Sequence, residues 1–268
     1  MGMSHLFGYI FSAFIGISLG LIGGGGSILT VPILVYLFHI EPVLATSYSL
    51  FIVGTTSAAG AIQKFRDDLV DVRTAIVFGT PSIIAVYLTR KFLVPSIPKT
   101  IFTIGNFELT KPVFLLLLFA LLMVSASISM IRGYGFLSRV KVDKSKINYP
   151  VLILDGLAVG TLTGFAGAGG GFLIIPALVF LSGLEMKKAI GTSLLIIASN
   201  TFFGFIGDIG HYEMNWTLLF TISSIAVGGI VIGHQLHHKI HGDHLKKGFG
   251  WFVLATGCYI IVRELFFT

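Results

Sequence analysis

The stretch GLIGGGGSILTVPIL at residues 20–34 returns as GFAGAGGGFLIIPAL at residues 164–178. In both copies a Gly-rich run precedes a short apolar run that contains one proline, Pro32 or Pro176. Glycine is a poor residue for a helix interior, where it costs about 1 kcal/mol relative to alanine. The two runs therefore predict two breaks between helices, and their repetition predicts a chain made of two related halves.

The composition around these stretches is that of a membrane protein. Of the 268 residues 54% are hydrophobic and 11% are charged, and the mean hydropathy is +0.93. A helix needs about 20 apolar residues to cross a bilayer, and such stretches follow one another along the chain. We expect an all-α integral membrane protein in contact with membrane lipid. The first apolar run reads as a retained element rather than a signal peptide.

Ten apolar segments are predicted along the chain. Two of them are too short to span a bilayer and are expected to be half-helices or arms of re-entrant hairpins, which leaves eight full spans. The predicted segments are 6–22, 28–39, 44–63, 74–92, 112–131, 150–166, 171–182, 190–207, 216–233 and 249–267.

The repeat continues downstream of the glycines, where Glu41 matches Glu185 and residues 45–47 resemble 191–193. We divide the chain into a first repeat at 1–131 with its break at 23–26, a basic cytoplasmic linker at 132–149, and a second repeat at 150–268 with its break at 167–171. Each repeat holds five elements. An odd number forces the second repeat to enter from the opposite face, so the repeats are predicted to be inverted.

Basic residues give the expected orientation, because cytoplasmic loops carry an excess of Lys and Arg. Loops 64–73, 132–149, 183–189 and 234–248 hold most of the 18 Lys and Arg residues. Placing these loops in the cytoplasm leaves both termini outside it. The opposite face then receives Arg90, Lys91, Lys99, Lys111 and Arg263.

Each break is predicted to open a short helix, beginning near Ser27 and Phe172. The first N–H groups of a helix lack intrahelical partners and attract anions. Two such starts in inverted halves would converge near the midplane on a small anionic substrate. The alternative is that the glycines only permit tight helix crossings. The candidate binding residues in the two breaks are Gly23, Gly24, Gly25, Gly26, Ser27, Gly167, Gly169, Gly170 and Gly171.

Polar residues in the third element of each repeat are candidates to line the same site. Hydroxyl and amide groups can bind an oxyanion without adding a full charge, although Ser and Thr often bond to their own helix instead. These candidates are Thr46, Ser47, Thr192, Ser193 and Asn200. Gating or proton coupling is considered for Gln63, Asp155, Asp208 and His211, against simpler roles as interfacial or capping residues.

Five histidines gather near one predicted helix end: His234, His237, His238, His241 and His244. They allow an alternative function, a permease for a transition metal or another small ion. Neighbouring lysines make a cationic segment near lipid phosphate the simpler interpretation. We therefore expect no resident metal and no cofactor.

The doubled Gly-rich motif, the 45–47 and 191–193 positions and Val70-Asp71-Val72 resemble the sulfite exporter TauE/SafE family over nearly the whole chain. The resemblance implies export of sulfite, sulfonates or related organosulfur anions across a bacterial-type inner membrane. It does not choose one anion, and the polar connection at 94–111 does not fit the usual pattern. No hydrolase motif, ATP-binding loop or nucleic-acid motif occurs, so we expect a secondary transporter rather than an enzyme. Direction, coupling ion and oligomeric state stay open.

Overall fold

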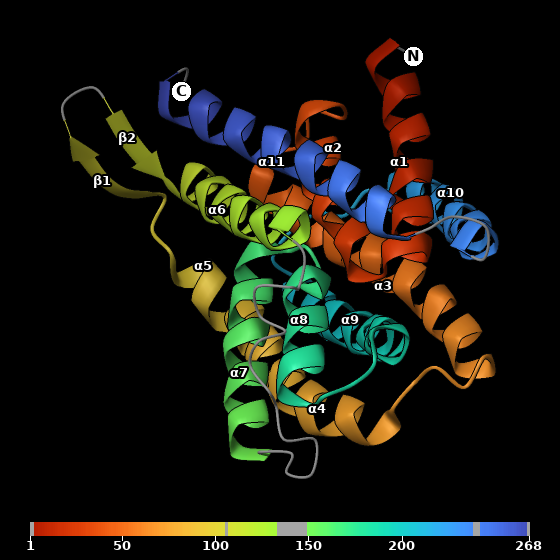
Figure 1. Ribbon diagram of the computed structural model, residues 1–268. Helices are drawn as coiled ribbons and strands as arrows, with labels where there is room; N and C mark the ends of the chain where they lie inside the picture. The colour runs from red at the N-terminus through yellow and green to blue at the C-terminus, as the bar shows by residue number, and fades with distance from the viewer. Residues whose placement is uncertain (1–2, 105–106, 133–148, 238–241, 267–268) are drawn as a thin grey trace.

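The computed structural model describes residues 3–104, 107–132, 149–237 and 242–266. The described chain is almost entirely helical, as expected, and Figure 1 shows its order. The elements are α1 (Met3–Ile22), the 3-10 helix η1 (Gly24–Leu29), α2 (Thr30–Tyr36), α3 (Pro42–Arg66), α4 (Val72–Leu88), the π-helix η2 (Thr89–Leu93), α5 (Val94–Ser96), β1 (Thr100–Ile104), β2 (Phe107–Thr110), α6 (Lys111–Arg132), α7 (Tyr149–Ala166), α8 (Gly171–Leu181), α9 (Met186–Asp208), α10 (Trp216–His237) and α11 (Gly242–Phe266).

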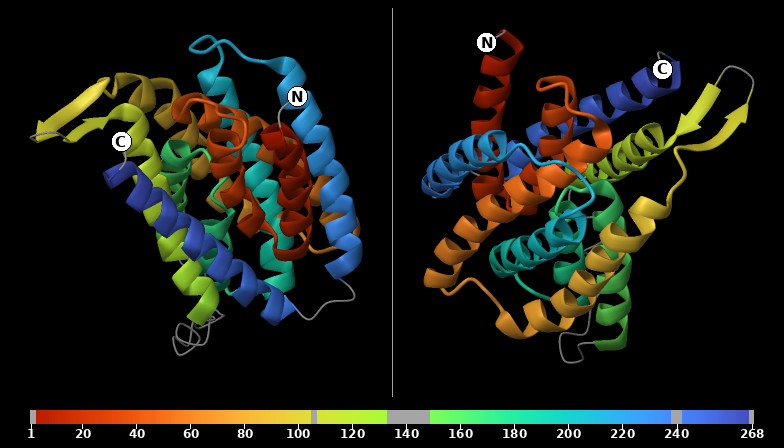
Figure 2. Two further views of the ribbon diagram at one scale, coloured as in Figure 1. Left: turned by 90° about the horizontal axis from the view of Figure 1, so that it is seen from above. Right: turned by 180° about the vertical axis from the view of Figure 1, so that it is seen from behind.

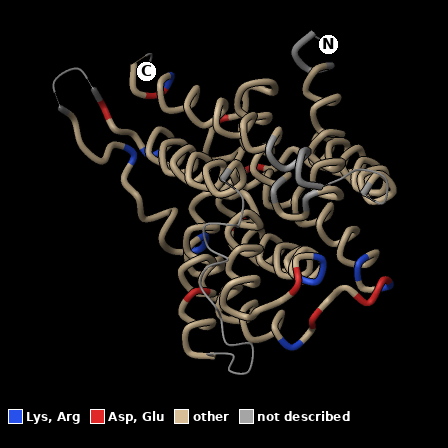
Figure 3. Tube along the Cα trace, viewed as in Figure 1, with Lys and Arg blue, Asp and Glu red and all other residues tan. Residues whose placement is uncertain are grey.

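Seven of the described helices are long and apolar enough to cross a membrane. They are α3, the continuous run of α4, η2 and α5, then α6, α7, α9, α10 and α11. The eighth expected span is α1, which has 20 residues but whose described apolar stretch, Phe7–Leu21, is shorter. The chain is thus a multi-pass membrane protein. Charged residues lie mostly near the ends of its helices (Figure 3).

Helices α3 and α9 pack against each other at the centre, where 72% and 61% of their spans are buried, compared with 28% for α11. Helix α1 packs on α10, α7 packs on α4, and α6 lies beside α11 (Figures 1 and 2). Exchanging the two halves turns the α1–α10 contact into the α7–α4 contact, and it leaves the α3–α9 and α6–α11 contacts as they are. The inverted orientation of the halves and the domain limits stay predictions.

Glycines allow the helices of both outer pairs to approach closely. A Cβ at Gly16 of α1 would lie 1.9 Å from the carbonyl oxygen of Ala226 in α10. On the other side, a Cβ at Gly160 of α7 would lie 2.4 Å from the carbonyl oxygen of Ser82 in α4. Small residues are the usual means of tight helix contact in membranes. The two pairs therefore use the same packing device.

The connection at 94–111, which the sequence left unassigned, contains a two-stranded antiparallel hairpin. Ile97 is extended before Pro98, as expected for a residue that precedes proline, and the helix ends there. Strands β1 and β2 follow and project away from the helices (Figures 1 and 2). In the described chain, this hairpin is where the structure differs from the expected all-α architecture.

Candidate functional site

The first break turns the chain back on itself. Gly23 has φ 75° and ψ −133°, a conformation that side chains disfavour, and it leads into η1 rather than directly into an α-helix. The α-helix begins only at Thr30 instead of near Ser27, because the glycine run does not sustain regular α-helical geometry. The ring of Phe38 then packs on Tyr9 near the start of α1. The α1–η1–α2 unit is therefore a hairpin that returns to its starting side.

The second break is a turn built from left-handed glycines. Gly167, Gly169 and Gly170 have φ values of 67°, 69° and 69°. Such values are strained for residues with a Cβ. Helix α8 begins at Gly171, one residue before the predicted start, and Gly170 occupies its N-cap without any side-chain cap. Both breaks predicted from the sequence therefore exist, and they differ in geometry.

The two breaks meet in the interior. A Cβ placed on Gly24 would lie 2.1 Å from the Cα of Gly171, and one on Gly171 would lie equally close to the Cα of Gly24. Both glycines are buried. The two breaks are thus in direct backbone contact. In this conformation neither position has room for any side chain.

Most of the remaining break glycines are also packed against protein atoms. A Cβ at Gly26 would lie 2.3 Å from Ser18 Oγ, and one at Gly169 would lie 2.8 Å from Val53 Cγ1. Ser27 donates its hydroxyl to the carbonyl of Gly24 at 2.8 Å. Tight crossing, the alternative weighed for these glycines, is therefore a sufficient account of their packing. Substrate binding by the glycines themselves stays a prediction.

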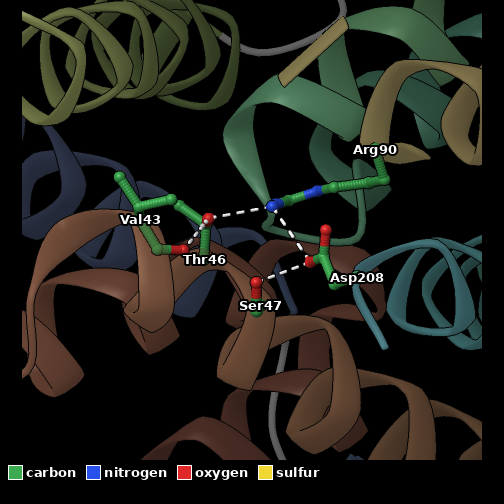
Figure 4. A network of polar contacts seen from close by, with 5 residues as sticks. All are labelled: Val43, Thr46, Ser47, Arg90 and Asp208. Atoms are coloured by element: carbon green, nitrogen blue, oxygen red, sulfur yellow. Dashed lines mark hydrogen bonds and ion pairs between the residues drawn. The ribbon is translucent and has the colours of Figure 1, made fainter. Parts of the chain in front are cut away.

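A buried arginine lies beside the second break. The Arg90 side chain, on η2, is 0% exposed, and its Nη1 donates to Thr46 Oγ1 at 3.0 Å and to Asp208 Oδ2 at 3.2 Å (Figure 4). Ser47 Oγ donates to the same Asp208 oxygen at 2.5 Å. Arg90, which was not proposed as a site residue from the sequence, thus contacts Thr46 and Asp208 directly and is linked to Ser47 through Asp208.

From the sequence, Arg90 was counted among the basic residues of the non-cytoplasmic face, and the structure adds that its side chain is buried within the continuous helical run Val72–Ser96. The π-helical turn η2 accommodates more residues than an α-helical turn, which alters the direction of its side chains. Such turns occur often at functional sites. A usable signal was present: Arg90 is a strong charge within a predicted apolar segment, and such charges mark function in membrane proteins.

Part of the Arg90 guanidinium has no protein partner. Its Nε and Nη2 atoms are buried without a hydrogen-bond acceptor among the described residues. Nη2 lies 2.6 Å from the position that a Cβ of Gly167 would occupy. The hydroxyl of Thr163, next to Gly170, is also buried without a partner in the described chain. Unused polar groups therefore flank both ends of the second break.

A phenol in the connection between α9 and α10 lies near the Arg90–Asp208 pair. Burial, together with the negative charges of Asp208 and Glu41, raises the pKa of the Tyr212 phenol, and Arg90 opposes that rise. Tyr212 also packs beside the apolar cluster of Val43, Val94 and Leu115. Tyr212 and Glu41 thus lie close enough to the Arg90–Asp208 pair for their electrostatic fields to interact.

The third-element residues of the second repeat take structural roles in this conformation. Thr192 Oγ1 accepts from the backbone N–H of Asp71 at 2.9 Å. Ser193 Oγ donates to the carbonyl of Ile190 at 2.8 Å within its own helix. Asn200 Nδ2 donates to Ser82 Oγ at 2.7 Å, while its Oδ1 has no partner in the described chain. Of these, Asn200 retains a polar atom that is unused.

The residues considered for gating are not brought together. Asp155 lies on α7 and Gln63 on α3, and each has one buried side-chain oxygen without a partner among the described residues. His211 is exposed and its ring lies 6.4 Å from that of Tyr212. Only Asp208 joins the Arg90 network. Any role of the other three in coupling stays a prediction.

One histidine of the cluster has a described side chain. His234 Nε2 lies 3.5 Å from Asp67 Oδ2 at the end of α3. His238 and His241 lie outside the described residues, and the side chains of His237 and His244 are likewise not described. No group of three potential metal ligands occurs among the described His, Cys, Asp and Glu residues.

The multi-pass helical fold, with a buried ion pair where its central helices end beside two broken helices, defines the class of membrane transport proteins. The sequence model of the family described as "Sulfite exporter TauE/SafE" matches residues 9–260. The chain therefore belongs to this family and is a membrane transporter. No solved structure matches the chain.

Relatives with similar names cover most of the chain. A "Probable membrane transporter protein" of Xylella fastidiosa strain Temecula1 is 33% identical over 263 residues, which is 93% of this chain and 92% of the relative. The "Probable membrane transporter protein YdhB" of Bacillus subtilis is 26% identical over 236 residues, 87% of this chain and 90% of the relative. Their names give the class of protein without a substrate.

Proposed function

We propose that this protein is a secondary transporter that exports a small sulfur oxyanion, such as sulfite, a sulfonate or a related organosulfur anion, across a bacterial-type inner membrane. The family description names sulfite export. The structural observation that carries the proposal is the fully buried Arg90 guanidinium beside the second break, with Nε and Nη2 unused within the described chain. A buried cation with unused donors favours an anionic solute.

The site combines one strong charge with weaker donors. Hydroxyls such as that of Thr163 and the N–H groups at the start of α8 can bind an oxyanion without adding a full charge. The partial neutralisation of Arg90 by Asp208 limits the affinity further. Moderate affinity is what a transporter needs, since it must release its substrate after each crossing.

The orientation and energy source belong to the same proposal. Both termini are placed outside the cytoplasm, as the distribution of basic residues indicates. Protons are the proposed coupling ion. We rank a metal or other small-ion permease based on the 234–244 histidines lower, because the neighbouring lysines make a cationic segment near lipid phosphate the simpler interpretation.

Flux measurements test the proposal. Purified protein in proteoliposomes should carry radiolabelled sulfite or methanesulfonate down its gradient, and chloride or a divalent cation much less well. Replacing Gly170 with Leu should abolish flux, because a Cβ there would lie 2.0 Å from Thr163 Oγ1 at a backbone φ of 69°. Gly228→Ala on α10 is the matched control, since nothing lies within 4 Å of its added Cβ. Cation flux without anion flux would contradict the proposal.

A further inference from the structure

The unused part of Arg90 has a defined shape. Nε and Nη2 lie on one edge of the planar guanidinium, and their N–H groups point in nearly parallel directions. This edge binds two oxygens of one carboxylate, sulfonate or phosphate side by side. In the described chain Nε and Nη2 are both buried and both lack an acceptor, whereas Nη1 makes both protein contacts.

The protein contacts leave this edge available. Asp208 and Thr46 engage Nη1 alone, and Asp208 Oδ2 also accepts from Ser47. Asp208 therefore does not form the side-by-side contact that an Arg–carboxylate pair often adopts. The edge group Nη2 instead lies against Gly167, at the break that opens α8.

We propose that Arg90 is the primary binding residue for the transported solute, and that its Nε and Nη2 donate to two oxygens of one oxyanion group. This inference rests on the proposed function, and it names Arg90 as the charged residue that contacts the transported anion. The ligand class is a small anion with at least two oxygens on one centre. Asp208 and Thr46 are positioning residues that hold the guanidinium through Nη1.

The assignment explains two features of the second break. Gly167 has φ 67°, and a side chain there would press on the guanidinium and on Thr46. Glycine thus keeps the backbone near Arg90 without covering the side-on edge with a side chain. Helix α8 begins four residues further on, at Gly171, so its unpaired N–H groups belong to the same region of the fold.

The main test compares Arg90→Lys with wild type. Lysine keeps the positive charge but lacks the two-donor edge. We expect the Kd for sulfite and methanesulfonate, measured by calorimetry on the purified full chain, to rise by about 10-fold or more. The reason is that lysine loses a pair of hydrogen bonds that both join a charged donor to a charged acceptor. Chloride, which has no pair of oxygens, should bind both proteins with similar weak affinity.

The matched control is Lys91→Met, which removes the neighbouring exposed cation that donates to Tyr87. Its oxyanion Kd should stay at the wild-type value. Asp208→Asn keeps an acceptor for Nη1 and removes the negative charge that partly neutralises Arg90, so its oxyanion affinity should exceed that of wild type. If Lys91→Met and Arg90→Lys lost equal oxyanion affinity, the loss would reflect the overall positive charge of the region rather than a specific contact. That result would overturn the assignment of Arg90.

A second variant guards against misfolding. Removing one member of a buried ion pair leaves the other charge uncompensated, whereas removing both is far better tolerated. The double variant Arg90→Met/Asp208→Asn should therefore keep a thermal midpoint close to that of wild type and lose detectable sulfite binding. Wild-type affinity in this folded variant, or in Arg90→Lys, would exclude Arg90 as the binding residue.

The two proposals fail in different ways. If wild type carries sulfite or methanesulfonate in proteoliposomes and Arg90→Lys does so with unchanged KM, only the assignment of Arg90 is wrong. If wild type carries no oxyanion at all, the proposed function itself is wrong.

Discussion

The two ends of the central helices each place a carboxylate beside a basic side chain, in very different surroundings. At one end Arg90, on η2 after α4, pairs with Asp208 at the end of α9 across 3.2 Å, and the two side chains are 0% and 1% exposed. At the other end His234 on α10 approaches Asp67, at the end of α3, to 3.5 Å, and the side chains are 19% and 40% exposed. One pair is excluded from water and the other is accessible to it.

The arrangement of the two pairs follows the proposed repeat. In each, a basic side chain near the end of one helical run faces a carboxylate at the end of a central helix, and the runs are α4–η2 with α9 and α10 with α3. If the halves are equivalent, the two contacts join corresponding helices, and the lower exposure at the Arg90 end is what a state closed at that end would show. The difference in exposure between the two pairs, rather than either pair alone, indicates which end of the central helices water can reach.

Removing the buried carboxylate should have the largest effect on stability. Asp208→Ala leaves Arg90 buried without its counter-charge, and such changes cost about 3–5 kcal/mol. The thermal midpoint in detergent should fall strongly. Asp67→Ala is the matched variant at the other end, and it should cost less than about 1 kcal/mol because its pair is exposed. Equal losses at both ends would show that the burial difference does not matter.

The second largest effect is expected in the rates of thiol labelling at the two ends of the central helices. The exposed Cys258 is first replaced with Ser, and single cysteines are then placed at Asp67 or at Ser47, which is 0% exposed. A water-soluble maleimide should modify the cysteine at 67 roughly 100-fold faster, because the buried position reacts only during opening. If saturating sulfite reverses the order of rates, access alternates between the ends. Similar rates without substrate would contradict the closed Arg90 end.

Adding a methyl group where the breaks cross should have an intermediate effect. Gly171→Ala places a Cβ 2.1 Å from Gly24 Cα, and overpacking of this kind costs about 1–3 kcal/mol. The thermal midpoint and sulfite flux should both fall. Gly228→Ala, whose added methyl meets nothing within 4 Å, should leave both unchanged. An unaffected Gly171→Ala would mean that the crossing opens readily.

The smallest effect is expected from the salt dependence of the exposed pair. Asp67→Asn should lower stability by about 0.2–1 kcal/mol at low ionic strength. In 1 M salt, where the screening length is about 3 Å, the difference from wild type should nearly vanish. A loss that persists in high salt would indicate that Asp67 is buried against His234 in the dominant state.

The fold could be predicted largely from local features. Apolar length identified the helices, and glycine conformational freedom identified both breaks, because these properties act within a few residues. The helix starts were less accurate: four glycines produced a 3-10 turn before Thr30, which no apolar count foresees. The hairpin at Thr100–Ile104 and Phe107–Thr110 was missed because a short pair of strands resembles a polar connection in a membrane sequence.

The candidate site could be predicted only in part. Thr46, Ser47 and Asp208 were selected because polar groups inside apolar segments are few and costly. Arg90 was counted only as a basic residue of the non-cytoplasmic face, because a cation near the end of a segment can lie at the interface or turn inward, and the direction of its side chain on a π-turn decides which. The residue types of Thr192 and Ser193 likewise could not show whether their hydroxyls bind a substrate or, as observed, bond to the backbone.

By itself, the sequence determined a multi-pass membrane protein with two glycine breaks, since hydrophobicity and backbone freedom are properties of short stretches of chain. Only the tertiary structure decided that Arg90 meets Asp208, 118 residues further along the chain, and that one edge of its guanidinium is left without an acceptor in the described chain. Such pairing depends on how α4 and α9 pack, and helix packing is set by contacts between distant segments rather than by any segment alone.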